Sequence, residues 1–162
     1  MKQIFTLLIV TICMLSCSDE EIDGDKYAYS YTNKSDLIIN TSEDSYMKFG
    51  TVASGENLVF EYRLNAEDDA QIADDEYGET IRFEIDEDLN EFSYSNTELA
   101  SMKVVFSKDC FCYFPMDVSK NVDPTGSISG QKISDKQWNI KIDVTFYGAD
   151  TRTIEERFTL KQ

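Results

Sequence analysis

The segment from Trp138 to Tyr147 constrains the fold more than any other part of the chain. Its apolar and polar side chains alternate strictly, and the apolar ones are Trp138, Ile140, Ile142, Val144 and Phe146. Successive side chains of a β-strand point to opposite faces of the sheet. The alternation therefore predicts a strand with one face in a core and the other face in water.

The residues after this strand predict a hairpin. Gly148-Ala149-Asp150 is a turn-prone sequence, and the apolar residues that follow it predict a returning strand with one buried face: Ile154, Phe158 and Leu160. Glu156 is a charged residue on that apolar face. An inward-pointing charge is typical of a sheet edge, where it discourages pairing with other chains.

Shorter alternating segments fill the region before this hairpin. They predict strands at residues 27–32, 37–39, 46–49, 58–64, 81–85, 92–94, 102–106, 111–114 and 127–133. Polar residues 33–36 predict a hairpin turn, and the Gly/Ser-rich residues 50–55 predict a turn after the strand at residues 46–49. Ser95 to Glu98 has the spacing of a capping box and predicts one helical turn.

The number and spacing of these segments predict an all-β fold. We expect an antiparallel β-sandwich with an immunoglobulin-like arrangement of about eight to ten short strands. A small closed barrel is the alternative. Residues 27–162 are enough for one domain with a substantial core.

The first 26 residues predict export and an anchor. Lys2 precedes an apolar run from Ile4 to Leu15, which is too short to span a membrane and is typical of a signal peptide. With Ser16, Cys17 and the acidic residues behind it, this region resembles the leader of small lipoproteins from Bacteroidetes-type bacteria. The resemblance implies a signal peptide over residues 1–16, acylation of Cys17, and a tether over residues 17–26.

The same resemblance implies attachment to the outer membrane, and the acidic run resembles the signals that export such lipoproteins to the cell surface. The alternative is an ordinary signal peptide cut nearby, which leaves Cys17 as a plain thiol. Extended, the residues between Cys17 and the domain reach at most about 30 Å. We therefore expect the membrane to be one partner, held through the lipid.

Charge limits the other partners. The chain has 15 Lys and Arg against 31 Asp and Glu, for a net charge of −16. Such a chain repels nucleic-acid phosphates and anionic lipid headgroups. We therefore expect no nucleic-acid binding, and membrane contact only through acyl chains.

Catalytic chemistry has little support in the sequence. The chain contains no histidine, the usual general base and the commonest metal ligand. It also lacks a nucleophile elbow, a phosphate-binding Gly-rich loop and a dinucleotide fingerprint. A pair of carboxylates could in principle hydrolyse glycosides, but 31 acidic residues give that pattern no specificity. We expect a protein that is not an enzyme and needs no cofactor.

Cys110 and Cys112 form the most distinctive chemical motif. They could act as a redox pair or as half of a soft-metal site, although no further soft ligand completes one. The commoner interpretation is two small buried side chains on one strand face. A bridge between them would need a kinked backbone, because two strand residues span about 6.6 Å.

An acidic segment over residues 65–79 interrupts the strand pattern. Carboxylates that could bind calcium weakly are Glu67, Asp68, Asp69, Asp74, Asp75 and Glu76. Their spacing does not match an EF-hand loop, and a solvated, self-repelling loop is the commoner outcome.

Tyrosine is unusually frequent, with nine residues in the chain. Tyrosines suit recognition surfaces, but they also suit half-buried sheet positions. We therefore expect a non-enzymatic, lipid-anchored binding module for an unidentified protein or glycan. The alternatives are an assembly subunit that docks through exposed edge strands and a thiol-redox protein that uses Cys110 and Cys112.

Overall fold

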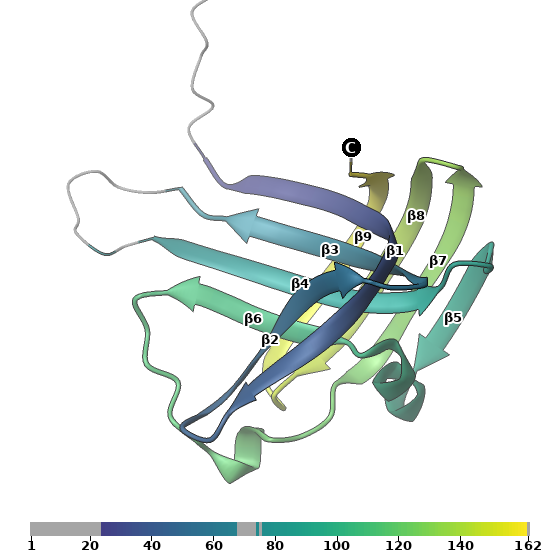
Figure 1. Ribbon diagram of the computed structural model, residues 1–162. Coiled ribbons are helices and arrows are strands. Elements are labelled where there is room, and N and C mark those ends of the chain that lie inside the picture. Colours follow the sequence, from purple (N-terminus) through teal and green to yellow (C-terminus); the bar gives the residue numbers. More distant parts are fainter. Residues whose placement is uncertain (1–23, 68–73, 75, 162) are drawn as a thin grey trace, which may run out of the picture.

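The computed structural model describes residues 24–67, 74 and 76–161, which fold into one sheet of nine strands (Figure 1). The strands are β1 (Lys26–Ser42), β2 (Ser45–Ser54), β3 (Asn57–Asn65), β4 (Tyr77–Asp86), β5 (Glu91–Ser95), β6 (Val105–Cys110), β7 (Thr125–Ser134), β8 (Gln137–Phe146) and β9 (Asp150–Leu160). Two short 3₁₀ helices, η1 (Asn96–Met102) and η2 (Val118–Lys120), lie in the connections. The predicted all-β, sandwich-like fold is confirmed.

The sheet curls so that its two halves face each other. The strand order is β5-β7-β8-β9-β1-β3-β4-β6, with β2 paired to β1. All pairs are antiparallel except β1–β9, which is parallel and spans only Ser30–Thr159 and Tyr31–Leu160. The immunoglobulin-like arrangement is not confirmed, because the strands form one continuous sheet with this parallel junction.

Aromatic side chains fill the space between the two halves. The Phe60 ring stacks on Phe83 at 5.0 Å and meets Trp138 edge-on at 5.6 Å. All three side chains are fully buried. Every second residue of β8 from Trp138 to Phe146 is buried, as the alternation predicted. Large rings that meet across the sheet halves account for the single main core.

β1 departs from the prediction of two strands joined by a turn at residues 33–36. It runs for 17 residues, and a register shift between Thr32 and Ser35 bends it, with Lys34 at φ 48°. Its second half pairs with β2 and packs on the outer face of the sheet, as Figure 1 shows. There Leu37 joins a small second core, and its N–H donates to the buried Glu84 carboxylate at 2.7 Å.

The predicted turn at residues 50–55 begins later than expected, because β2 continues through Gly50 to Ser54 and the chain bends at Gly55 and Glu56. Glycine is required at position 50 by close packing rather than by a turn. A Cβ atom there would lie 2.9 Å from both Leu37 and Val105. Because Gly50 has no side chain, β2 can approach Leu37 and Val105 closely, and the β1–β2 hairpin packs flat on the sheet.

The predicted hairpin at the C-terminus and the predicted helical turn are both confirmed. β8 and β9 pair along their full length. Among the described residues, only β1 pairs with the other edge of β9, and only at Thr159 and Leu160. Helix η1 begins after Ser95, whose N–H donates to the Glu98 carboxylate at 3.0 Å in a capping box.

Candidate functional site

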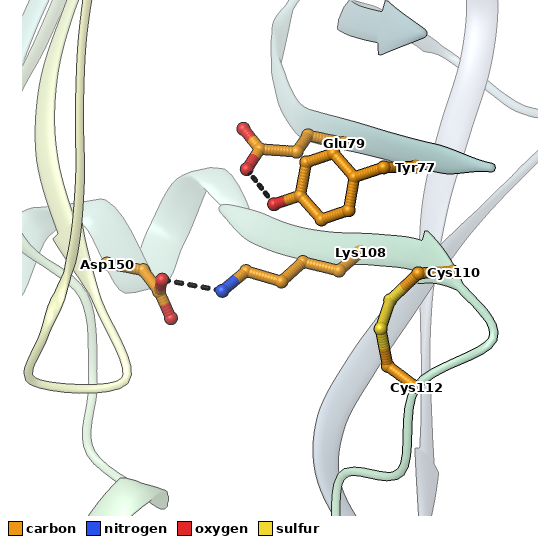
Figure 2. Close-up of a disulfide and its surroundings, with 6 residues drawn as sticks. All are labelled: Tyr77, Glu79, Lys108, Cys110, Cys112 and Asp150. Carbon is orange, nitrogen blue, oxygen red and sulfur yellow. Dashed lines mark hydrogen bonds and ion pairs between the residues drawn. A yellow bond between two sulfur atoms is a disulfide. The ribbon is translucent and has the colours of Figure 1, made fainter. Parts of the chain in front are cut away.

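Cys110 and Cys112 are joined in a disulfide at the end of β6 (Figure 2). Their Cα atoms lie 5.1 Å apart, closer than the roughly 6.6 Å between alternate residues of a strand. The chain turns at once, because the Cys112 N–H donates to the Cys110 carbonyl at 2.7 Å. The predicted strand at residues 111–114 is therefore wrong, and so is the interpretation of the cysteines as two buried thiols on one strand face.

The disulfide changes what these cysteines can do. Both sulfurs are bonded to each other, so neither is a thiolate available to a soft metal. Cys112 is exposed and Cys110 is half-buried. A thiol-disulfide exchange role needs prior reduction or attack by an external thiolate.

The loop after the disulfide exposes several large apolar side chains. We call residues 111–124, which join β6 to β7, the disulfide loop. Phe111 is 85% exposed, and Tyr113 and Val118 are each 84% exposed. Met116 and Val122 are also exposed. Clusters of exposed apolar side chains on an otherwise polar surface mark interaction sites.

Local contacts fix the loop while leaving these side chains in solvent. The Phe114 ring packs edge-on against Tyr46 at 6.0 Å. The Met116 N–H donates to the Asp44 carbonyl at 3.0 Å, which ties the loop to the β1–β2 turn. Asp117 caps η2 by accepting the Ser119 N–H at 2.9 Å. The exposed rings therefore stand on an ordered base.

A charged network lies beside the disulfide and links β4 and β6 to β9 (Figure 2). The buried carboxylate of Glu79 accepts hydrogen bonds from the Tyr77 hydroxyl and from the Arg152 guanidinium, whose Nε lies 2.6 Å from Oε2. Lys108 Nζ lies 2.7 Å from the Asp150 carboxylate. These bonds cross between the two halves of the sheet at the side where β9 is free.

Titration properties follow from this packing. Burial alone would raise the pKa of Glu79, but the hydrogen bonds from Arg152 and Tyr77 and the positive charge nearby hold that pKa below its usual value. Burial and the neighbouring Glu79 carboxylate raise the pKa of Tyr77 to about 12. The Arg152 guanidinium also lies 5.0 Å from the centre of the Phe106 ring. The network thus holds a charged carboxylate and a neutral phenol in place.

Four of the nine tyrosines lie in two other places. Tyr27, Tyr29 and Tyr62 form an aromatic cluster on β1 and β3, with Tyr29 and Tyr62 ring centres 5.7 Å apart and Tyr27 53% exposed. Tyr147, beside the β8–β9 turn, is buried like Tyr62. Its hydroxyl donates to the Phe106 carbonyl at 2.6 Å and accepts the Lys48 N–H at 3.1 Å.

The weak calcium site has no support within the described residues. Asp68, Asp69 and Asp75 lie outside those residues. The Glu67 N–H donates to the Asp25 carboxylate at 3.1 Å, while Asp74 and Glu76 are exposed. No group of three or more acidic or cysteine residues in the described part of the chain is arranged to hold a metal ion.

Sequence reasoning placed the cysteine pair but missed the exposed aromatic loop. The pattern from Phe111 to Phe114 is as apolar as a strand, but the chain turns at the bridge between the cysteines, and Phe111 and Tyr113 are exposed. Two cysteines separated by one residue could have indicated this, because an extended strand cannot accommodate a bridge between them.

The predicted lipidation site, Cys17, lies outside the described residues, as do the predicted signal peptide and most of the tether. Within residues 24–67, 74 and 76–161, no helix is long and apolar enough to cross a membrane. Searches with the whole chain found no matching protein-family model, curated protein or solved structure.

Proposed function

We propose that this protein is a lipid-anchored, non-enzymatic module of the bacterial cell envelope that binds a partner protein through its disulfide loop. The observation that carries the proposal is the exposure of Phe111 and Tyr113 on a turn held by a disulfide. The leader and Cys17 support attachment to the outer membrane, and the acidic run behind them supports display on the cell surface.

Energetics favour a binding role for these rings. A buried aromatic ring removes about 150–250 Å² from water, and aromatic residues dominate binding hot spots. Phe111 and Tyr113 obtain almost none of that burial within the fold. The disulfide and the contacts of Phe114 and Met116 order the loop beforehand, so binding costs less conformational entropy.

The acidic residues around the exposed rings indicate which kind of partner surface would fit. Asp109, Asp117 and Asp123 flank the exposed rings, and the chain as a whole carries −16. A partner that presents an apolar pocket with a basic rim fits this surface, since complementary charges speed association and exclude acidic competitors.

Photo-crosslinking in intact cells tests the binding surface. A photoreactive phenylalanine analogue at position 113 should yield one discrete crosslinked protein, and the additional change Phe111→Ala should abolish that product. The matched control places the analogue at position 49, where Phe49 is 48% exposed on β2, and should yield none. Equal crosslinking from both positions would overturn the proposed surface.

Cell fractionation tests the anchor separately. Replacing Cys17 by Ala should move the protein from the membrane fraction to the soluble fraction, because the acyl chains attach through that sulfur. Retention of the Cys17→Ala protein in the membrane fraction would contradict lipidation, whatever the result of crosslinking.

A second candidate is an assembly subunit that docks by strand addition. Its support is the free edge of β9 from Asp150 to Phe158, which pairs with β8 but with no other strand among the described residues. Such an edge can accept another strand, although Glu156 on its inner face opposes this. A stoichiometric complex that survives Phe111→Ala but is lost on replacing Thr153 by Pro would favour this role.

A further inference from the structure

The edge of β9 that faces away from β8 carries a row of outward-directed backbone groups. At the C-terminal end of β9, the Leu160 N–H donates to the Lys136 carbonyl at 3.0 Å, at the turn before β8. The next N–H, that of Lys161, donates in the opposite direction to the Tyr31 carbonyl of β1 at 2.9 Å. Alternate residues of a strand direct their backbone groups to the same edge. The β8–β9 ladder has no register shift, so the residues of β9 oriented like Lys161 are Thr151, Thr153, Glu155, Arg157 and Thr159.

Four of these five residues have no strand beside them. β1 pairs with β9 only at Thr159 and Leu160. Within residues 24–67, 74 and 76–161, no other strand reaches this edge. The four residues without a partner strand are all exposed: Thr151, Thr153, Glu155 and Arg157. Their N–H and carbonyl groups can therefore form a ladder with one further strand.

The inner face of this edge carries one charge that the fold does not compensate. Glu156 pairs directly with Ile140, whose side chain lies in the core, so the Glu156 side chain lies on the same face of the sheet. It is exposed, and no Lys or Arg of the described part of the chain forms an ion pair with it. The other charged residues on this face of β9, Asp150 and Arg152, form ion pairs with β6 and β4. A strand added to this edge therefore meets a single unpaired carboxylate.

An aromatic ring lies close to that carboxylate. Tyr29 on β1 is half-buried, and its ring meets Phe158 edge-on at 5.5 Å, two residues along β9 from Glu156. Burial raises the pKa of Tyr29, and the negative charge of Glu156 raises it further. An ammonium or guanidinium group suits this place, because it can pair with the carboxylate and contact the face of the ring.

These features select among strands that could dock. A neutral or acidic residue opposite Glu156 leaves its carboxylate unpaired or repelled, so Glu156 acts against such strands. The net charge of −16 attracts basic segments and opposes docking of a second copy of the chain. On the outer face Glu155 already pairs with Lys141, and Arg157 is exposed, so a neutral residue suits those positions.

We propose that the free edge of β9 binds an extended segment of a partner protein by strand addition, with a Lys or Arg opposite Glu156 and an apolar residue opposite Ile154. Ile154 packs against the main core from the inner face of β9, between Arg152 and Glu156. The proposal rests on the strand-addition role named above and adds the chemistry of the partner. It does not involve the disulfide loop.

Hydrogen exchange of the purified full-length protein in detergent, followed by NMR, tests whether the edge is free. The N–H groups of Thr151, Thr153, Glu155 and Arg157 should exchange faster than those of Arg152, Ile154 and Glu156, which face β8. Equal protection of the two sets would show that the edge is already covered, and would overturn both the strand-addition role and this proposal.

A blocked peptide of sequence Thr-Lys-Thr-Val-Thr-Ser-Thr tests the ligand chemistry. In antiparallel pairing its Lys lies opposite Glu156 and its Val opposite Ile154. Its addition should slow exchange of the four edge N–H groups, and replacing its Lys by Glu should weaken binding about tenfold, measured by fluorescence anisotropy. Methylating the backbone nitrogen of its third residue, which faces Glu155, should abolish binding, whereas methylating that of its fourth should not. No binding of the Lys peptide would overturn the proposal.

Charge reversal on the protein locates the cation. Glu156→Lys should reverse the preference, so that the Glu peptide binds more tightly than the Lys peptide. Glu155→Lys is the matched control, because the side chain of Glu155 lies on the opposite face, and it should leave the preference for the Lys peptide in place. Phe111→Ala should leave peptide binding unchanged. Equal binding of both peptides to a free edge would overturn the basic ligand but not strand addition itself.

Discussion

Two turns of this molecule carry aromatic residues, and they use them in opposite ways. At the β8–β9 turn, Tyr147 is 6% exposed and its hydroxyl joins β6 to β2 through two backbone hydrogen bonds. At the turn after β6, Phe111 is 85% exposed. An aromatic residue at a turn is therefore no sign of recognition in itself. The two turns differ in whether the folded chain buries the aromatic ring or leaves it in solvent.

The largest expected effect concerns the buried turn. Tyr147→Ala should lower the free energy of unfolding by about 3 kcal/mol or more, because it removes a buried ring and leaves the Phe106 carbonyl and Lys48 N–H without partners. Urea unfolding followed by tryptophan fluorescence measures this. Phe111→Ala, the matched change at the exposed turn, should alter the free energy of unfolding by no more than about 0.5 kcal/mol. Similar losses for both variants would break the contrast.

The charged network at the base of the disulfide turn gives the next effect. Arg152→Ala should lower the free energy of unfolding by about 3 kcal/mol, because it leaves the buried Glu79 carboxylate without its main partner. The control is Lys141→Ala, which breaks the exposed Lys141–Glu155 pair and should cost less than about 1 kcal/mol. If the two costs were equal, the network would not be the rigid base that the exposed turn requires.

The same network predicts a dependence on pH. The pKa of Glu79 lies below its unfolded value, so its stabilising effect is complete above about pH 4.5 and is lost as the pH falls through the lowered pKa. The pKa of Tyr77 is raised to about 12, so stability also falls between about pH 10 and 12, where unfolded tyrosine ionises first. Unfolding midpoints measured across pH should show both losses. Glu79→Gln should reduce the loss of stability at low pH. The same loss in the variant and the parent protein would contradict the assignment to Glu79.

The disulfide should contribute less to stability than to binding. Replacing both Cys110 and Cys112 by Ala should cost less than about 2 kcal/mol, because the bridge spans a single residue and restricts the unfolded chain little. The same change frees the turn that presents Phe111, so partner affinity should fall at least tenfold. Calorimetric unfolding and a binding titration with the crosslinked partner separate the two effects. A large stability loss with unchanged affinity would reverse the roles assigned to the two turns.

The sequence predicted those strands in which apolar and polar residues alternate and every apolar side chain is buried. β8 is the clearest case, because every second side chain from Trp138 to Phe146 reaches the core without help from distant residues. The course of β1 was not predictable in this way. Its residues 33–36 suit a tight turn and a bulge equally, and the Glu84 carboxylate that holds Leu37 lies 47 residues away.

The candidate sites were less predictable for the same reason. The disulfide overrides the strand-like pattern after Cys110, so the exposed rings follow from a covalent bond rather than from periodicity. Cys17 was identified from the leader, and its acylation stays a prediction.

The affinity of a Phe111→Ala, Tyr113→Ala double variant for the crosslinked partner tests the central contrast most directly. Measured beside its free energy of unfolding, the variant should bind at least a hundredfold more weakly while its stability stays within about 1 kcal/mol of the parent protein. The same affinity as the parent, or a loss of binding matched by a loss of folding, would contradict the assignment of these rings to a partner.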